Sequence, residues 1–511
     1  MAPIVSFGCA LTVLAAGAAT VVASPTLTLP LSRGAPVSGT VKAQNAKREV
    51  AHVQNKLRAA EANWRRNQKR SLPERDIHLE KRVTPSSGSA DLTEFWVDFL
   101  DSSYYATVSV GTPAQSFMVV ADSGSSDFWL ASPGSIGVPN VFDPSTSTTF
   151  EDSLIPIEIP YGKGTFDGTI GTDTVSLAGF TTATSIVEYG VVDDEAFEFR
   201  QMSGIMGFAW STIAASGSMT FMEQLVKAGA LSSNVVSFHL GRGTDDLQPE
   251  QGFQNGTIKA GSITIGGTDS STYTGDIEFF DIVQAAHWVI QADGMSVDGK
   301  LVSATSGVQA MMDTGTSLVV MPNASWSALA DALDAKEDNT SGLLVADCSS
   351  ELPTVALRIG GKDYNFAPED LALGVIPINS SALAKAYDMK QGSIACLLPF
   401  AGGQESSELD ETAPMIIFGD SFLKSWTSVF DVENAKVGLA AASPASPYTK
   451  VSDAVDFKLK QEGLTRASAT STGKGTSSTG SSSSSAARNL DSNAVGALAL
   501  LAALGSVFLT L

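Results

Sequence analysis

Short apolar runs separated by turn-forming residues dominate the chain between residues 98 and 442. Runs rich in Val, Ile, Phe, Thr and Tyr, such as YYATVSVGTPAQSFMVVAD and GSITIGGTDSSTYTGDIEFF, alternate with Gly, Pro, Asp and Ser. This alternation is typical of β-strands joined by tight turns. Only a few segments, best exemplified by MTFMEQLVKAGAL and ASWSALADALDA, have apolar residues at helical spacing. The pattern therefore predicts a mainly β fold with few helices.

One motif occurs twice along this β-rich region. An aspartate follows an apolar run in VVADSGSSDFWL (residues 119–130) and again, 191 positions later, in AMMDTGTSLVVM (residues 310–321). Each copy is followed by an apolar-apolar-Gly segment, GIMGFA in the first half and IIFGDSF in the second. Solenoid repeats have periods of about 20–50 residues. The longer spacing therefore predicts two similar lobes, over residues 83–272 and 273–445.

The charge of the chain is divided unevenly. The net charge is −22, yet residues 24–82 carry 13 Lys and Arg against 5 Asp and Glu, whereas the remainder from residue 83 carries 19 against 49. A region this acidic repels nucleic acid, which excludes nucleic-acid binding. The acidic composition also suggests that the protein acts at a pH where carboxylates are partly protonated.

The N-terminal region predicts two processing signals. Residues 1–23 are uncharged, apolar and end in small residues, as in a secretory signal peptide. Residues 24–82 contain a basic helical stretch and two dibasic pairs, Lys69-Arg70 and Lys81-Arg82. We expect this region to be a propeptide removed by dibasic cleavage; an ordinary basic helix is the alternative.

The C-terminal region predicts a lipid anchor. Residues 446–490 form a Ser/Thr-rich stalk, a composition that cannot build a core. Residues 491–511 form an apolar tail without a basic flank, as in a GPI-anchor signal whose attachment residue stays open. A membrane-spanning helix is the alternative. We expect a protein of the secretory pathway that is anchored at the cell surface, to the plasma membrane or the cell wall.

The cysteines and glycosylation sequons agree with a secretory route. Cys9 lies in the signal peptide, which leaves Cys348 and Cys396 as an isolated pair expected to form a disulfide. Closing a loop of this size is worth roughly 4 kcal/mol. Four Asn-X-Ser/Thr sequons are candidate N-glycosylation sites, namely Asn255, Asn323, Asn339 and Asn379.

The repeated motif suggests a specific chemistry. Gly124 and Gly315 permit tight turns whose backbone N–H groups face the preceding carboxylate. Nearby hydroxyls can also donate hydrogen bonds to it. If a two-fold axis brings Asp122 and Asp313 together, the like charges cannot both ionise, and the pair shares one proton. One carboxyl then acts as base on a water, and the other donates a proton to the carbonyl under attack.

These segments and their order resemble the pepsin-like aspartic endopeptidases. The resemblance covers most of residues 104–442 and includes YYATVSVGTPAQSF, DSGSSDFWL, FDPSTSTTF, YGKGTFDGTIGTDTV, GGTDSSTYTGDIEF, DTGTSLVV and FGDSFLKSWTSVFDVENAKVGLA. It implies a bilobal β fold with the active-site cleft between the lobes, and Asp122 and Asp313 as the catalytic pair. It also implies supporting or flap roles for Ser123, Gly124, Ser125, Thr314, Gly315, Thr316, Trp129, Tyr161, Gly162 and Lys163. The second-lobe disulfide of the family corresponds to Cys348–Cys396.

The resemblance also raises expectations about regulation and specificity. In the family a propeptide lysine reaches the catalytic pair, and Lys47 and Lys56 are both candidates here. We therefore expect a zymogen whose basic propeptide covers an acidic cleft and is released at low pH. Among GPI-anchored fungal relatives, the yapsins cut after basic residues.

Two features predict opposite substrate preferences. A patch of acidic residues would favour substrates with basic side chains, whereas Lys163 would disfavour them. The alternative interpretation is that the acidic residues only form a solvated loop. Apolar specificity is the default. The acidic residues are Asp193, Asp194, Glu195 and Glu198, and the apolar pocket candidates are Phe197, Phe199 and Ile205.

Other classes fit the sequence less well. A two-carboxylate glycosidase gives the twin motifs no role, and a non-catalytic adhesion protein need not keep both aspartates. Serine hydrolase chemistry is set aside because His239 and His287 are interpreted as ordinary strand residues. No metal is expected, because the chain lacks clustered His and Cys ligands. We expect a monomer without cofactors that acts on proteins or peptides.

Overall fold

The computed structural model describes residues 39–68, 85–97, 100–135, 137–138, 140–161, 164–192, 202–242, 256–404, 414–461 and 464–466. All contacts reported below lie within one compact unit, residues 1–470. The predicted signal peptide, the dibasic pairs and the C-terminal tail lie outside the described residues.

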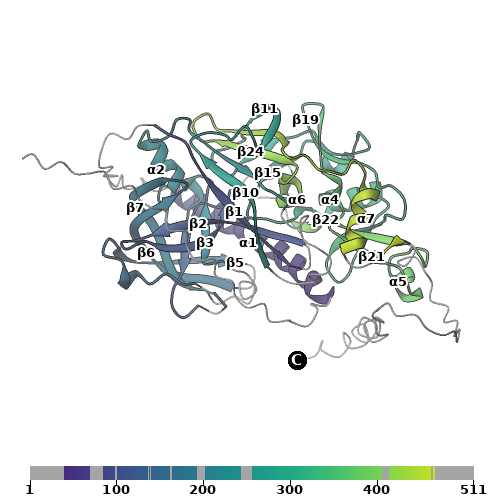
Figure 1. Ribbon diagram of the computed structural model, residues 1–511, viewed down its shortest axis with the longest axis horizontal. Helices are drawn as coiled ribbons and strands as arrows, with labels where there is room; N and C mark the ends of the chain where they lie inside the picture. The colour runs from purple at the N-terminus through teal and green to yellow at the C-terminus, as the bar shows by residue number, and fades with distance from the viewer. Residues whose placement is uncertain are drawn as a thin grey trace, which may run out of the picture. The chain divides into compact units, whose positions relative to one another are not determined.

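The largest element is a sheet of thirteen strands that contains segments from both halves of the chain (Figure 1). Its strand order is β11-β25-β24-β9-β10-β1-β2-β3-β8-β4-β7-β6-β5. The strands are β1 (Gly88–Val97), β2 (Leu100–Val110), β3 (Gln115–Asp122), β4 (Phe128–Ala131), β5 (Glu151–Tyr161), β6 (Gly164–Leu177), β7 (Phe180–Val192), β8 (Gly204–Gly207), β9 (Val235–His239), β10 (Gly256–Ile265), β11 (Tyr273–Asp281), β24 (Trp426–Asp431) and β25 (Lys436–Ala442).

Two further sheets belong to the second half. An eight-stranded sheet consists of β12 (Val289–Gln291), β15 (Gln309–Met312), β16 (Val319–Pro322), β17 (Lys336–Glu337), β18 (Leu343–Asp347), β21 (Gly374–Pro377), β22 (Ile394–Gln404) and β23 (Met415–Phe418). A four-stranded sheet consists of β13 (Gly294–Val297), β14 (Lys300–Leu301), β19 (Val355–Ile359) and β20 (Lys362–Asn365). The expected mainly β fold is confirmed.

The two halves repeat one strand arrangement. In the first half, β3 pairs in parallel with β8, and β8 pairs antiparallel with β4. In the second half, β15 pairs in parallel with β23, and β23 pairs antiparallel with β16. The apolar-apolar-Gly segment of the first half lies in β8, which ends at Gly207, and that of the second half is the end of β23 with the following Gly419. In each half, this strand therefore lies beside the strand that leads to the aspartate. The expectation of two similar lobes is therefore confirmed.

Helices are few, and two lie where helical spacing predicts them. These are α2 (Phe221–Lys227) and α3 (Asn323–Ala332). Thr220 and Glu223 begin α2 with a capping box, in which each side chain accepts a hydrogen bond from the other's backbone N–H. The other helices are α1 (Gly39–Asn67), α4 (Pro368–Leu371), α5 (Ser381–Ala386), α6 (Asp420–Leu423) and α7 (Val451–Gln461), with 3₁₀ turns η1 (Pro144–Thr146), η2 (Ser211–Ile213) and η5 (Ser303–Thr305).

Helix α7 corrects the predicted start of the stalk. Residues 446–490 are expected to lack a core, yet Val451, Val455 and Leu459 are buried at a spacing of four residues. Glu351 accepts a hydrogen bond from the backbone N–H of Val451 at 2.6 Å, which fixes the start of the helix. The Ser/Thr-rich composition concealed this short amphipathic segment. Among the described residues, no helix combines the length and apolarity needed to cross a membrane.

The predicted disulfide is present in the second lobe. Cys348 and Cys396 are bonded, fully buried, and separated by 48 positions. Three of the four sequon asparagines, Asn323, Asn339 and Asn379, are exposed, whereas Asn255 lies outside the described residues.

Replacing both Cys348 and Cys396 by alanine is expected to lower the free energy of unfolding by about 4 kcal/mol, because the unfolded chain regains the entropy of an open loop. Denaturant unfolding of the double variant, compared with wild type before and after chemical reduction, measures this loss. Reduced wild type should match the variant. A difference below about 1 kcal/mol between oxidised wild type and the variant would contradict the expectation.

Candidate active site

Two buried aspartates end matching strands. Asp122 is the last residue of β3 and is 2% exposed, and Asp313 directly follows β15 and is 1% exposed. The backbone N–H of Gly124 donates to Asp122 Oδ1 at 2.8 Å, and that of Gly315 donates to Asp313 Oδ1 at 2.9 Å. Both carboxylates are therefore held by the same backbone geometry, as the repeated motif predicts.

Hydroxyl groups complete both carboxylate environments. Ser125 Oγ donates to Asp122 Oδ2, and Thr316 Oγ1 donates to Asp313 Oδ2 at 2.8 Å. Each aspartate thus accepts one backbone and one hydroxyl hydrogen bond from its own loop. These donors orient the carboxyl groups and favour their ionised forms.

The two loops are locked together by their second residues. The N–H of Ser123 donates to Thr314 Oγ1 at 3.0 Å, and the N–H of Thr314 donates to Ser123 Oγ at 2.9 Å. The same hydroxyls donate onward, Ser123 to the carbonyl of Met312 and Thr314 to the carbonyl of Ala121. Serine therefore makes the contacts that threonine makes on the other side, which explains why it can stand in the first motif.

Each motif glycine allows the opposite aspartate to approach. A Cβ atom on Gly124 would lie 2.3 Å from Asp313 Oδ1, and one on Gly315 would lie 2.3 Å from Asp122 Oδ1. Such distances are far below van der Waals contact. The pair can be brought together only because both positions lack a side chain.

Replacing Gly124 by alanine is expected to reduce kcat/KM about 10²-fold, because the added methyl displaces Asp313 from its position beside Asp122. Steady-state kinetics on a peptide substrate measure the effect. Gly374→Ala is the matched control, since its added methyl meets nothing within 4 Å. Equal activity of both variants would show that the close approach is unimportant.

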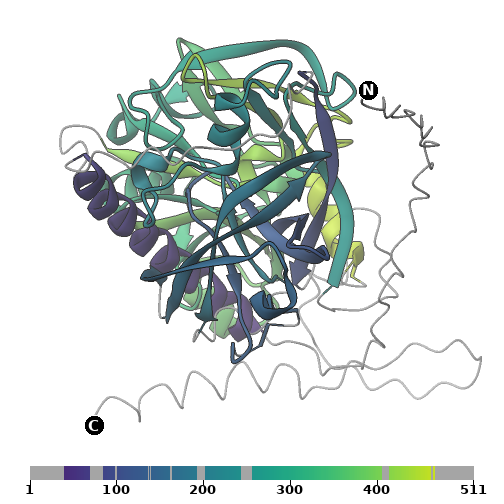
Figure 2. The same ribbon diagram turned by 90° about the vertical axis from the view of Figure 1, so that its left-hand side faces the viewer.

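Helix α1 contacts both lobes (Figures 1 and 2), and its Lys56 lines a small cavity together with Asp122. Lys56 Nζ lies 2.7 Å from Asp122 Oδ1 and 2.9 Å from Asp313 Oδ1, and the lysine is 6% exposed. A single ammonium group therefore bridges both carboxylates. Lys47, the other candidate, instead donates to the exposed backbone carbonyl of Asn339 at 2.9 Å.

Further contacts fix α1 along the cleft. Glu49 accepts a hydrogen bond from the N–H of Ser317, and Asn63 donates to the carbonyl of Ile213 at 3.1 Å. A cavity of about 30 Å³ remains between the helix and the catalytic motif of the first lobe. Sequence patterns cannot predict these polar contacts, because the partners are backbone groups.

The three charges shift one another's pKa values. Burial raises the pKa of Asp122 to about 6, with Lys56 lowering and Asp313 raising it. Burial also acts to raise the pKa of Asp313, but Lys56 and hydrogen bonds outweigh it and bring the pKa to about 2. Burial acts to lower the pKa of Lys56, and the two carboxylates reverse that effect and raise it.

His287 lies beside this site, which differs from its predicted place in a strand. It occupies a bend between β11 and β12 and is 2% exposed. Burial, and then the charge of Lys56, lower the pKa of His287 to about 4, while Asp313 opposes this. Its neighbour Ala286 belongs to the same apolar cluster as Ala60 of α1. A single histidine in an apolar run does not predict a position beside the two aspartates.

The predicted flap hairpin is described in part. Strand β5 ends at Tyr161, which pairs with Gly164 at the start of β6. Trp129 is buried on β4 and packs on Phe166 of β6, with ring centroids 4.9 Å apart. Ile205 is buried in β8. The remaining predicted residues of the flap and of the acidic patch lie outside the described residues, namely Gly162, Lys163, Asp193, Asp194, Glu195, Phe197, Glu198 and Phe199.

Within the described residues, no three or more His, Cys, Asp or Glu side chains are arranged to hold a metal ion. The site offers two coupled carboxyls, ordered donors and a cation supplied by a separate helix.

Comparison with known proteins agrees with this geometry. Residues 103–442 match the family model for eukaryotic aspartyl proteases, a range that includes both aspartates and excludes α1. The chain is 31% identical over 356 residues to gastricsin of Callithrix jacchus, covering 68% of this chain and 83% of the relative. It is also 31% identical over 352 residues to pepsin A of Sus scrofa, covering 67% and 82%.

Proposed function

Since the chain belongs to the eukaryotic aspartyl protease family and is an aspartic-type endopeptidase, we propose that Asp122 and Asp313 form its catalytic pair and that α1 keeps it latent. The observation that carries this proposal is the Lys56 bridge to both carboxylates in a closely matched pair of loops.

The proposed reaction is hydrolysis of a peptide bond by an activated water. The ionised carboxylate takes a proton from water as its oxygen bonds to the substrate carbonyl carbon, and the protonated partner donates to the carbonyl oxygen. The carboxyl that took the proton from water then donates it to the amine nitrogen as the C–N bond breaks, and the other carboxylate takes a proton from a hydroxyl of the tetrahedral intermediate as the carbonyl re-forms. The pair thus ends in its starting protonation state, and neither a nucleophilic side chain nor a metal is needed.

Helix α1 is the proposed inhibitory part of the propeptide. Lys56 satisfies both carboxylates and occupies the place where water and substrate would bind. Because α1 lies within the basic region of residues 24–82, its removal by dibasic cleavage or acid autolysis would free the cleft. A hairpin flap at residues 161–164 would then close over the substrate.

The sign of the pH effect follows from comparing α1 docked with α1 displaced. In the docked state the pKa of Asp313 is about 2, below that of a free carboxyl, because Lys56 and hydrogen bonds outweigh the effect of burial. The displaced state therefore binds a proton at Asp313 more tightly, and docking loses this contribution as the pH falls from about 4 to about 2. Burial raises the docked pKa of Asp122 to about 6, so Asp122 acts in the opposite direction, and the acid release of α1 rests on Asp313.

Secretion and anchoring remain part of the proposal. A signal peptide over residues 1–23, exposed sequons and a buried disulfide support a secretory route. The apolar tail over residues 491–511 supports a GPI anchor at the cell surface. Apolar substrate specificity is retained as the default, with basic specificity as the alternative.

An acid-pH assay on denatured haemoglobin, with and without pepstatin, tests the activity. An aspartic endopeptidase cleaves the substrate, and pepstatin stops the cleavage. A glycosidase or a non-catalytic wall protein would leave haemoglobin intact. Cleavage that pepstatin does not affect would contradict the proposed catalytic pair.

A further inference from the structure

A second pair of acids lies buried in the first lobe, outside the catalytic pair. Glu188 is on β7 and is fully buried, and Asp127 precedes β4 and is 8% exposed. Strands β4 and β7 run in parallel, with Trp129 opposite Glu188. The mechanism proposed above uses neither carboxyl group.

Asp127 is well supplied with donors. Its two oxygens accept hydrogen bonds from the N–H of Ala215 at 2.7 and 3.0 Å, and Oδ1 also accepts from the N–H of Ser216 at 3.3 Å. These bonds tie Asp127 to the loop that follows η2. Its charge is therefore supported by the backbone of that loop.

This loop forms a wall of the cleft that α1 fills. Asn63 of α1 donates to the carbonyl of Ile213, and Asn67 donates to the carbonyl of Ala214 at 2.9 Å. A substrate that replaces α1 meets the same wall.

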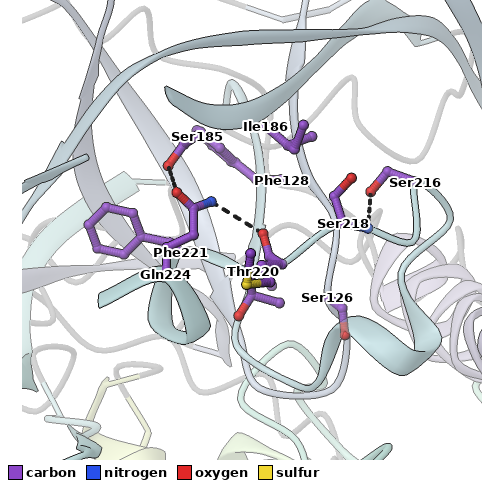
Figure 3. Close-up of a pocket in the computed structure, with 11 residues that line it drawn as sticks. Ser126, Phe128, Ser185, Ile186, Ser216, Ser218, Thr220, Phe221 and Gln224 are labelled. Carbon is purple, nitrogen blue, oxygen red and sulfur yellow. Dashed lines mark hydrogen bonds between the residues drawn. The ribbon is translucent and has the colours of Figure 1, made fainter. Parts of the chain in front are cut away.

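The loop's other end is held by neighbouring elements. There, Gln224 of α2 donates to the carbonyl of Met219 and accepts from Ser185 of β7 (Figure 3).

Glu188 differs from Asp127 in having no backbone donor. Neither of its oxygens makes a hydrogen bond of normal geometry to the described groups, and the Ser216 hydroxyl acts to lower its pKa less than burial and Asp127 act to raise it. An ionised carboxyl buried without a donor is very unfavourable. A protonated carboxyl needs only an acceptor, and the carboxyl group of Asp127 lies within hydrogen-bonding reach of Glu188.

We propose that Glu188 is a positioning residue, which remains protonated and donates its hydrogen bond to Asp127, thereby holding the cleft wall at residues 211–217. Burial, and then the charge of Asp127, raise the pKa of Glu188 well above its usual range. Burial also raises the pKa of Asp127, while the N–H of Ala215 opposes that rise. The two acids thus share a proton for a structural purpose.

Other charged groups near β7 are engaged elsewhere. From β6, Asp167 accepts from Thr165, and Asp173 accepts from Thr149 at 2.6 Å. From α2, Glu223 accepts from Ser211 and Thr220, and Lys227 lies at the C-terminal end of the helix. Asp127 is therefore the titratable group that governs Glu188.

The pH dependence follows from the raised pKa. Between the unfolded pKa of a glutamate and the higher folded one, the folded lobe binds more protons than the unfolded chain. Stability from this pair is therefore full at acid pH and is lost as the pH rises through the folded pKa of Glu188. Above that pH, two buried carboxylates repel each other and release the wall.

Glu188→Gln tests this directly, since the amide donates to Asp127 at every pH. The full-length chain is held at pH values from about 4 to 8, and unfolding is followed by tryptophan fluorescence, a readout that is independent of catalysis. We expect the midpoint of alkaline unfolding to rise by about half a pH unit or more. The peptidase activity that remains after each incubation is then assayed at acid pH. This second readout rests on the proposed function and should show the same shift of the midpoint.

Glu158→Gln is the matched control, because it makes the same substitution at Glu158, which is exposed on β5 of the same lobe. Its midpoint should stay at the wild-type value. Asp127→Asn, whose amide can donate to Glu188, should shift the midpoint upward as Glu188→Gln does.

Difference infrared spectra near neutral pH provide a second measurement. Wild type should show a protonated-carboxyl band that Glu188→Gln lacks. The absence of this band, or equal midpoints in Glu188→Gln and Glu158→Gln, would overturn the proposal. A wild-type chain that shows no acid peptidase activity, while Glu188→Gln still shifts the unfolding midpoint, would count against the catalytic pair and leave this inference intact.

Discussion

Asparagine in place of Asp122 or Asp313 is expected to lower kcat/KM of the processed enzyme by at least about 10⁴-fold. The amide oxygen can still accept the hydrogen bond from the N–H of the loop glycine, but the side chain can neither take a proton from water nor pass one to the substrate. Because the two carboxyls share one proton, removing either should remove both the base and the acid. Acid-pH hydrolysis of a peptide substrate measures the loss.

Asp276→Asn provides the control, since Asp276 is exposed on β11 and loses the same charge far from the pair in sequence. Its activity should equal that of wild type. Thermal melting of all three variants separates loss of function from loss of folding. Full turnover by either active-site variant in a folded state would rule out the proposed mechanism.

Replacing Lys56 by methionine is expected to give a precursor that cleaves substrate near neutral pH without prior processing. Removing one partner from a buried ion pair costs about 3 kcal/mol or more, because the remaining charges are left without compensation. This corresponds to roughly a 10²-fold larger population with α1 displaced. The measurement is the initial rate of a processing-blocked precursor, in which both dibasic pairs are replaced.

The second candidate lysine supplies the matched control. Lys47 donates to one exposed backbone carbonyl, and contacts of this kind contribute little to stability. Lys47→Met should therefore leave the precursor as latent as wild type. If Lys47→Met and Lys56→Met are equally active, the bridge to the catalytic pair does not hold α1 in place.

The features that sequence patterns predict well are those that repeat or follow a strict local rule. The two Asp-Ser/Thr-Gly-Ser/Thr motifs predict a matched pair of loops, and the structure brings Asp122 and Asp313 under one ammonium group. Helix α2 is predicted by apolar spacing and is begun by its capping box. In both cases, neighbouring residues carry the information.

The features that escape prediction depend on contacts between distant segments. Choosing Lys56 over Lys47 requires knowing which face of α1 enters the cleft, and an amphipathic pattern cannot give the rotation of a helix about a partner. In the sequence, Glu188 cannot be distinguished from any other polar residue of a strand, because its shortage of hydrogen-bond donors becomes visible only in the structure. Helix α7 was concealed because composition over a long window outweighs a spacing of four residues.

The pH profile of kcat/KM for the processed enzyme tests most directly whether Asp122 and Asp313 work as a pair that shares one proton. The account predicts a bell-shaped profile with an acid optimum, whose two limbs report loss of the base at low pH and loss of the acid at high pH. Asp313→Asn should abolish the whole curve. A profile that rises to a plateau above neutral pH, or one that Asp313→Asn leaves unchanged, would contradict it.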